Sequence, residues 1–170
     1  MVAFRHRSEL DASVRLLGPS GPRLITLVDF FTGPGKTVLR PNEILTEIRI
    51  PPVRPHSGAV YLKHCPRRAM DLASIGIAAA LTLEDGRISQ VGIAMGAVAP
   101  TPRRAPQAEA ILAGQPPSPE LIEQAAEAAA AEASPISDVR ASAAYRRQMV
   151  YVLVRRTVQQ ALQLAEAKKQ

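Results

Sequence analysis

The sequence contains one cysteine and no tryptophan among its 170 residues. Because Cys65 has no second cysteine to pair with, an internal disulfide is excluded. The first ten residues are too charged for a secretory signal peptide, and together these two features favour a reducing cytoplasm. The longest apolar stretch, residues 72–83, is shorter than the roughly 20 residues that a membrane-spanning helix requires. We therefore expect a soluble, cytoplasmic chain with no membrane span.

Large aromatic side chains are also few, with three phenylalanines and three tyrosines. The net charge of +6 and a pI near 10.1 raise the question of a nucleic-acid partner. The basic residues, however, are scattered as pairs, and so few aromatics make a base-stacking platform hard to build. We therefore expect no nucleic-acid partner, and binding to nucleic acid is the weakest of three functional hypotheses.

The first part of the chain has the pattern of a strand pair. Residues 12–17 alternate apolar and polar side chains, residues 18–21 (Gly-Pro-Ser-Gly) are a turn sequence, and residues 24–28 are extended again. An isolated two-stranded hairpin is only marginally stable in water. The hairpin is therefore predicted to belong to a sheet whose other strands lie elsewhere.

Residues 41–50 predict a further strand. Ile44, Ile48 and Ile50 alternate there with charged residues, which is the pattern of a strand buried on one face. A pair of prolines, Pro51 and Pro52, ends the run.

Three more strands are predicted at residues 60–65, 73–83 and 88–98. The last two are joined by a tight turn that contains Asp85-Gly86, a dipeptide suited to positive φ. Such short connections indicate antiparallel order.

From Thr101 onward the sequence is rich in alanine and has helical periodicity. Helices are predicted at residues 105–112, at residues 119–133 after the capping residue Ser118, and at about residues 138–165. Four strands followed by three helices indicate an α+β fold, an antiparallel sheet of three to four strands with three helices packed on one face.

The sequence Gly33-Pro34-Gly35-Lys36-Thr37 has the end of a phosphate-binding loop without its beginning. The motif's first glycine would fall at Phe30, and Pro34 has no N–H to donate to a phosphate. The pattern after it is that of a strand, whereas a phosphate loop opens a helix. We therefore do not expect nucleotide hydrolysis.

Metal binding and nucleophilic catalysis find no better support. The three histidines, His6, His56 and His64, lack the spacing of metal ligands. Cys65 lies near two arginines, but a lone cysteine on a strand is more often a small buried hydrophobe than a reactive thiol. We expect no metal site and no catalytic side chain.

Several cationic side chains gather where one predicted strand ends. The segment 63–71 (Lys-His-Cys-Pro-Arg-Arg-Ala-Met-Asp) leads through a proline-arginine loop into the next strand. From composition alone, a solvated loop that adds solubility is favoured over a binding site.

Three segments taken together resemble the FAD-binding subunit of molybdenum hydroxylases of the carbon monoxide/xanthine dehydrogenase type. They are residues 29–51 (DFFTGPGKT, then PNEILTEIRIP), residues 63–105 (KHCPRRAMDLASIGIAAAL through IAMGAVAPTPRRA) and residues 137–156 (SDVRASAAYRRQMVYVLVRR). Their order and spacing match the family's C-terminal domain. The resemblance assigns residues 29–170 to that domain and residues 1–28 to a hairpin remnant of a preceding FAD-binding domain.

The resemblance implies a function in electron transfer. In this family FAD accepts electrons from [2Fe–2S] clusters, which receive them from a molybdenum cofactor, and passes them to an external acceptor. The C-terminal domain closes over one side of the flavin. Leu45 matches a position that packs on the cofactor, Lys63 matches a lysine that reaches it, and the loop from Arg67 to Asp71 corresponds to one that approaches the flavin ring. The expected cofactor-binding residues are therefore Leu45, Lys63, Arg67 and Asp71.

The family's pyrophosphate-binding glycine loops have no counterpart before Asp29. We therefore expect the chain alone to bind FAD weakly or not at all and to be inactive. Its expected partners are a glycine-loop FAD-binding domain and the iron–sulfur and molybdenum subunits of the same complex. The alternative is a non-catalytic assembly module that docks through its helices, with Arg146, Arg147, Arg155 and Arg156 as interface contacts.

Overall fold

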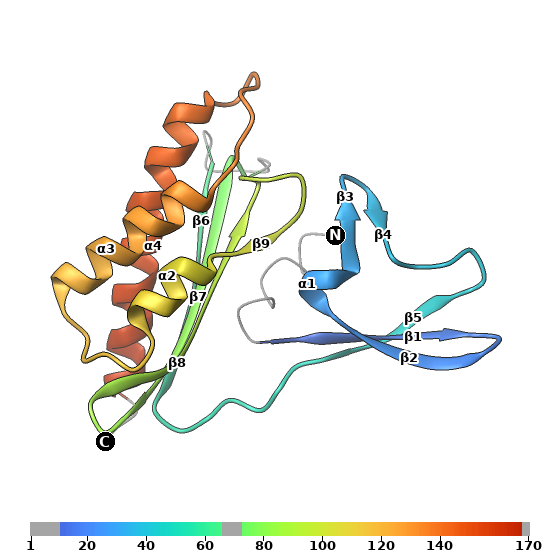
Figure 1. Cartoon of the computed structure of the whole chain (residues 1–170), viewed down its shortest axis with the longest axis horizontal. Coiled ribbons are helices and arrows are strands. Elements are labelled where there is room, and N and C mark those ends of the chain that lie inside the picture. Colours follow the sequence, from blue (N-terminus) through green and yellow to red (C-terminus); the bar gives the residue numbers. More distant parts are fainter. Residues whose placement is uncertain (1–10, 66–72, 168–170) are drawn as a thin grey trace.

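The computed structural model describes residues 11–65 and 73–167. Figure 1 shows two lobes, which we call the N-terminal lobe (residues 11–50) and the C-terminal lobe (residues 57–65 and 73–167). The elements in chain order are β1 (Ser13–Gly18), β2 (Gly21–Thr26), α1 (Leu27–Phe30), β3 (Phe31–Gly33), β4 (Lys36–Thr37), β5 (Ile44–Arg49), β6 (Ser57–His64), β7 (Ile75–Glu84), β8 (Arg87–Gly96), β9 (Arg103–Arg104), α2 (Pro106–Leu112), α3 (Pro119–Glu132) and α4 (Ala143–Ala167).

The N-terminal lobe is built on the antiparallel sheet β2-β1-β5. The hairpin β1–β2 forms as predicted, because Gly21 supplies the positive φ of +99° that its turn requires. Val14 and Leu16 are fully buried on one face of this sheet, against Leu27 and Phe30 of α1. The hairpin thus has the third strand and the apolar cover that a strand pair needs in water.

Strand β5 differs from its prediction in partner and in orientation. It pairs with β1 of the hairpin and not with the later strands. The β1–β5 register shifts between Arg15 and Leu16, which leaves Thr46 as the extra residue of a bulge. Because the bulge reverses the alternation, Ile44 (63% exposed) and Ile48 lie on opposite faces, and the isoleucines do not share one buried side.

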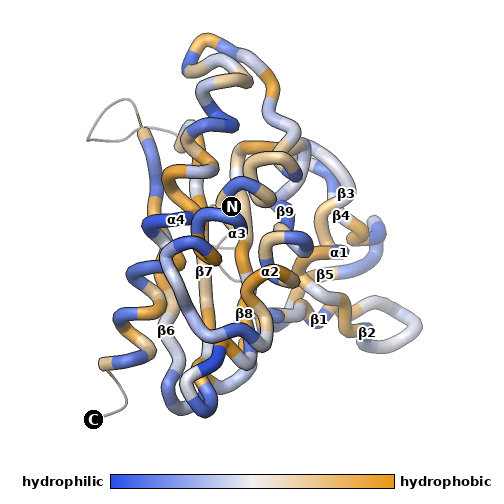
Figure 2. Tube along the Cα trace, turned by 60° about the vertical axis from the view of Figure 1, so that its left-hand side comes forward, coloured by the Kyte–Doolittle hydropathy of each residue, from blue (hydrophilic) through white to orange (hydrophobic). Residues whose placement is uncertain are grey.

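The C-terminal lobe is the antiparallel sheet β6-β7-β8-β9, with α2, α3 and α4 packed on one face. This confirms the predicted α+β class, with three helices on one side of an antiparallel sheet. Figure 2 shows alternating hydrophobic and hydrophilic residues along α4, as expected of a helix with one buried side. Its buried side chains include Val150, Val154 and Val158.

Strand β7 is buried along nearly its whole length and consists mainly of alanine, isoleucine and leucine. Its neighbour β6 approaches α4 closely enough that only glycine fits at position 58. A Cβ built on Gly58 would lie 1.9 Å from the carbonyl oxygen of Ala161. The glycine therefore sets the distance at which the sheet and its longest helix pack.

The helices agree with their predictions at α2 and α3 and disagree at the start of α4. The Ser118 hydroxyl accepts a hydrogen bond from the Leu121 amide (3.1 Å), which caps α3 as expected. Helix α4 begins at Ala143, five residues later than predicted. The reason is Asp138, whose carboxylate accepts the backbone N–H groups of Arg140 and Ala141 and holds that segment in a turn.

The described residues, 11–65 and 73–167, contain no helix that is both long and apolar enough to cross a membrane. The division of the chain at residue 28 stays a prediction.

Candidate functional site

The face of the C-terminal sheet that carries no helix is the first part of the candidate site. On β6, Val60 and Leu62 pack toward the helices, so the alternating residues Tyr61 and Lys63 lie on the opposite face. Lys63 is exposed. Figure 1 shows the N-terminal lobe on this same side of the sheet. We call this surface, formed by β6, β7 and β8, the open face.

The floor of the open face is made of small residues. The register places Gly76, Ala78 and Ala80 of β7 on it, beside Gly92 and Ala94 of β8. A Cβ added at Gly76 would lie 2.5 Å from the Tyr61 hydroxyl oxygen, so the Tyr61 side chain extends across β7. These small residues are themselves buried (Ala78 is 1% exposed, Ala94 3% and Ala80 9%), whereas Lys63 at the end of β6 is exposed.

The end of β6 is joined to the start of α4 by a side-chain contact. The His64 Nε2 atom lies 3.1 Å from the Tyr145 hydroxyl, within hydrogen-bonding distance. Cys65 follows and is half-buried. This contact connects the strand that carries Lys63 to the helical layer.

The structure places two of the four predicted cofactor residues. Leu45 lies on β5, half-buried against the cluster that contains Leu16 and Phe30. Lys63 lies on the other lobe, at the end of the open face. Arg67 and Asp71 lie outside the described residues. The predicted site is thus divided between two sheets.

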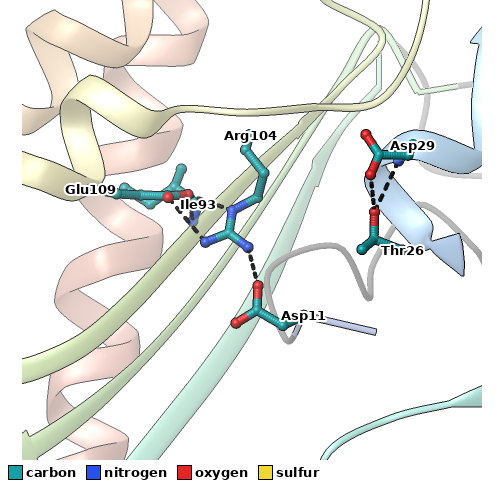
Figure 3. Close-up of polar contacts among 6 residues, drawn as sticks. All are labelled: Asp11, Thr26, Asp29, Ile93, Arg104 and Glu109. Carbon is teal, nitrogen blue, oxygen red and sulfur yellow. Dashed lines mark hydrogen bonds and ion pairs between the residues drawn. The ribbon is translucent and has the colours of Figure 1, made fainter. Parts of the chain in front are cut away.

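A polar connection between the lobes was missed by the sequence analysis. The Arg104 guanidinium donates to both oxygens of Glu109 (2.6 and 3.0 Å) and to the Asp11 carboxylate (2.7 Å), as Figure 3 shows. The same Glu109 accepts the backbone N–H of Ile93 (2.8 Å), which ties α2 to β8. Burial lowers the pKa of Arg104, but the hydrogen bonds that it donates to Glu109 and Asp11 outweigh this effect and hold the pKa above its ordinary value. A sequence signal was present only for Glu109, an acid in the first turn of α2.

A second ion pair in the N-terminal lobe holds the start of β5. Arg23 on β2 donates to both oxygens of Glu43 (2.7 Å each), and the backbone N–H of Arg40 donates to the same carboxylate (2.9 Å). The Arg23 side chain, followed by the Arg40 amide, lowers the pKa of Glu43 to about 2. These contacts fix the chain just before Leu45.

A cavity of about 670 Å³ lies at the end of the open face remote from Lys63. Its lining includes the connecting segment, residues 51–54, and the polar side chains of Ser57, Thr82 and Gln90. The hydroxyls of Ser57 and Thr82 are 2.8 Å apart and satisfy each other. Neither Leu45 nor Lys63 lines this cavity.

One proposed interface residue proves to be structural. Arg146 is buried, with its side chain 5% exposed, and donates to Asp138 (2.5 Å) and to the carbonyl of Ala97 (3.3 Å). The backbone N–H of Arg140, and then Arg146, hold the pKa of Asp138 below its usual value. Arg146 therefore fixes the loop before α4, and the prediction that it contacts another subunit is wrong. Arg147 and Arg156 are exposed, and Arg155 is half-buried and pairs with Glu123 at 3.4 Å.

The chain thus combines an α+β lobe, whose sheet has one face without helices, with the strands of a second sheet before it. Comparisons with known proteins find this arrangement in one class of protein. The family model described as CO dehydrogenase flavoprotein C-terminal domain matches residues 60–161, which is more than half of the chain. The model described as FAD binding domain in molybdopterin dehydrogenase matches residues 8–53. The chain belongs to the CO dehydrogenase flavoprotein C-terminal domain family.

Individual relatives agree with this assignment. The nicotine 6-hydroxylase medium subunit of Paenarthrobacter nicotinovorans is 40% identical over 152 residues, covering 89% of this chain and 53% of its own. The xanthine dehydrogenase FAD-binding subunit of Escherichia coli O157:H7 is 33% identical over 161 residues, covering 94% and 55%. The solved carbon monoxide dehydrogenase from Hydrogenophaga pseudoflava matches with a TM-score of 0.89 and 35% identity, covering 93% of this chain and 55% of that one. The chain thus spans about half the length of the relatives that it matches.

Proposed function

We propose that this chain completes the flavin site of a molybdenum-hydroxylase-type oxidoreductase. The end of β6 that carries Lys63, together with β5, would lie against one side of FAD, with Lys63 and Leu45 as contacts. The observation that carries the proposal is the position of Lys63, exposed on the sheet face that carries no helix and on the side of the N-terminal lobe. Lysines on the helical face would have had no access to a ligand between the lobes.

The described residues fit one part of FAD and not the other. Half-buried Leu45 offers apolar contact to a planar ring, and Lys63 offers a positive charge at its edge. A pyrophosphate needs backbone N–H donors, usually from a glycine loop that opens a helix. The exposed turn at Gly35 leads into strand β4 instead. The phosphates would therefore be held by a glycine-loop domain outside these 170 residues.

FAD, when bound, would supply the electron exchange between [2Fe–2S] clusters, which a molybdenum cofactor reduces in partner subunits, and an external acceptor. The protein's part is to position the ring and to adjust its charge balance. The cation of Lys63 would favour the form of the ring that carries more negative charge.

Titration of FAD fluorescence tests this proposal. The chain would be titrated alone and with a glycine-loop FAD domain taken from a relative. We expect tight binding only for the pair, weakened by Lys63→Ala and unchanged by Lys36→Ala, a matched exposed lysine on β4. Equal binding by both lysine variants would count against the proposal.

The alternative, a non-catalytic assembly module, predicts a different result. Its interface would depend on the remaining arginines of α4, Arg147, Arg155 and Arg156, because Arg146 is buried. In a purified complex, turnover that is lost on Arg147→Ala and Arg156→Ala and kept on Lys63→Ala would favour this alternative.

A further inference from the structure

The loop between α3 and α4, residues 133–142, exposes apolar side chains. Val139 is fully exposed and Ile136 is 70% exposed, and we call these two residues the docking tip. We propose that the docking tip contacts the subunit that donates electrons to the flavin, through an apolar pocket of that subunit bordered by carboxylates. The inference rests on the proposed function, and it names a partner surface for the same site.

The docking tip is held on an anchored loop. The backbone N–H of Ser134 donates to the carbonyl of Val98 (3.0 Å), which ties the start of the loop to the end of the sheet. The backbone N–H of Asp138 donates to the carbonyl of Ala141 (3.1 Å), and its carboxylate accepts the side chain of buried Arg146. Because these bonds fix the backbone on both sides of the tip, binding would cost little further ordering of the loop.

The residue types of the loop are unusual for an exposed turn. Asp138 suits the turn, because its carboxylate accepts backbone N–H groups two and three residues later. Val139 follows it with a branched apolar side chain wholly in solvent. One exposed apolar residue is common on a protein surface. Two of them, three residues apart on a loop with a fixed backbone, indicate a contact surface.

The docking tip lies at the end of the C-terminal lobe that carries Lys63. Strand β6 ends at His64, whose Nε2 atom lies 3.1 Å from the hydroxyl of Tyr145 in the first turn of α4. Tyr145 is itself 43% exposed. Figure 1 shows the loop between α3 and α4 projecting at this same end of the lobe. Electron transfer weakens steeply with distance, so a subunit that reduces a flavin beside Lys63 must touch the protein near here.

The charges around the docking tip define the chemistry of the partner. Residues 133–147 contain three arginines and one acid, Asp138. Buried Arg146 pairs with that acid, whereas Arg140, 3.8 Å from the same carboxylate, stays 42% exposed and Arg147 is exposed. An apolar centre with a charged rim is the usual composition of an interface, and a cationic rim favours carboxylates on the partner.

Photo-crosslinking in the purified complex tests the docking tip. In a Cys65→Ser background, Val139→Cys and Leu164→Cys would each be labelled with benzophenone maleimide, and crosslinked peptides would be identified by mass spectrometry. Leu164 is 44% exposed near the other end of α4 and is the matched control. We expect position 139, and not position 164, to crosslink to the subunit that carries the [2Fe–2S] clusters. Crosslinks from position 139 only to the glycine-loop domain, only to a second copy of this chain or to no protein would overturn the proposal.

Dissociation of the complex on dilution, followed by sedimentation velocity, gives a second measure. Val139→Glu should weaken association of that subunit at least about tenfold, because a carboxylate would enter an apolar contact. Leu164→Glu should associate normally. Because the Val139 side chain is fully exposed, Val139→Glu should keep the Tm of the wild type, so a loss of association is not a loss of folding. Equal association of the two variants would overturn the proposal.

The two proposals fail separately. Absence of crosslinks at position 139 while FAD binding still depends on Lys63 would overturn the docking tip and leave the flavin site standing. Crosslinks to the electron-donating subunit in a complex whose FAD binding ignores Lys63→Ala would do the reverse.

Discussion

Replacing Gly58 with alanine should destabilise the C-terminal lobe strongly. The added Cβ would lie 1.9 Å from the Ala161 carbonyl oxygen and 2.9 Å from the Ala165 nitrogen. Both are backbone atoms of α4, so no side-chain rotation can relieve the overlap. Ordinary contact would require β6 and α4 to separate by about 1.5 Å, which would open the packing of Val60 and Leu62 against that helix.

Such overpacking costs about 3 kcal/mol or more, at the upper end of the usual range. For a chain of this size that cost lowers Tm by about 6 to 12 °C. The assay is thermal unfolding followed by circular dichroism, with urea unfolding as a second measure. Gly33→Ala is the control, because its Cβ would meet nothing closer than 3.9 Å. If Gly58→Ala melted within about 2 °C of that control, the packing argument would be refuted.

Three further predictions concern polar contacts. The pKa of Glu43 is about 2 in the folded protein against 4.5 ordinarily, so the stabilisation by its ion pair is present above pH 4.5 and is lost as pH falls through about 2. The Tm difference between wild type and Glu43→Gln should therefore be largest at neutral pH and shrink on acidification. A difference that does not change with pH would contradict this. Arg104→Ala should cost about 2 to 3 kcal/mol in urea unfolding because Glu109 loses its charged partner, whereas Asp11→Ala, at an exposed pair, should cost about 0.5 kcal/mol or less. Ser118→Ala should lower the free energy of unfolding by about 1 kcal/mol in the same assay, because it removes the cap of α3. An unchanged urea midpoint would show that the cap does not stabilise the protein.

Local signals explain most of what the sequence predicted correctly. The turns at Gly21 and Gly86 have positive φ in the structure, so the residues that marked them are those the backbone requires. The Ser118 cap and the proline after it located α3 for the same reason. These features depend on residues close in sequence, and their physics is visible in a short window.

The sequence predictions were wrong where the structure depends on contacts between residues far apart in the chain. The partner of β5 is β1, about 30 residues earlier, and alternation within a strand carries no information about which strand it joins. The bulge at Thr46 places Ile44 and Ile48 on opposite faces, whereas strict alternation predicted that they share one. Helix α4 begins later than predicted because Asp138, to which Arg146 donates, holds residues 138–141 in a turn, and periodicity does not reveal these contacts.

The sequence predicted the strand that carries Lys63 but not the contacts that connect the two lobes. The sequence predicted a strand at residues 60–65, and the structure places Lys63 on it, on the face opposite Val60 and Leu62. The connection from Arg104 to Asp11 spans 93 residues of sequence and could be found only from the fold. The assignments of Leu45 and Lys63 to FAD stay predictions.

The central claim is that the cation of Lys63 faces the flavin ring. The most direct measurement is the two-electron reduction potential of FAD bound to this chain together with a glycine-loop FAD domain, compared between wild type, Lys63→Gln and Lys36→Gln. Because a positive charge stabilises the reduced ring, we expect Lys63→Gln to lower the potential by about 30 mV, equivalent to about 1.4 kcal/mol, and Lys36→Gln to leave it unchanged. A potential that is the same in all three proteins would contradict the account.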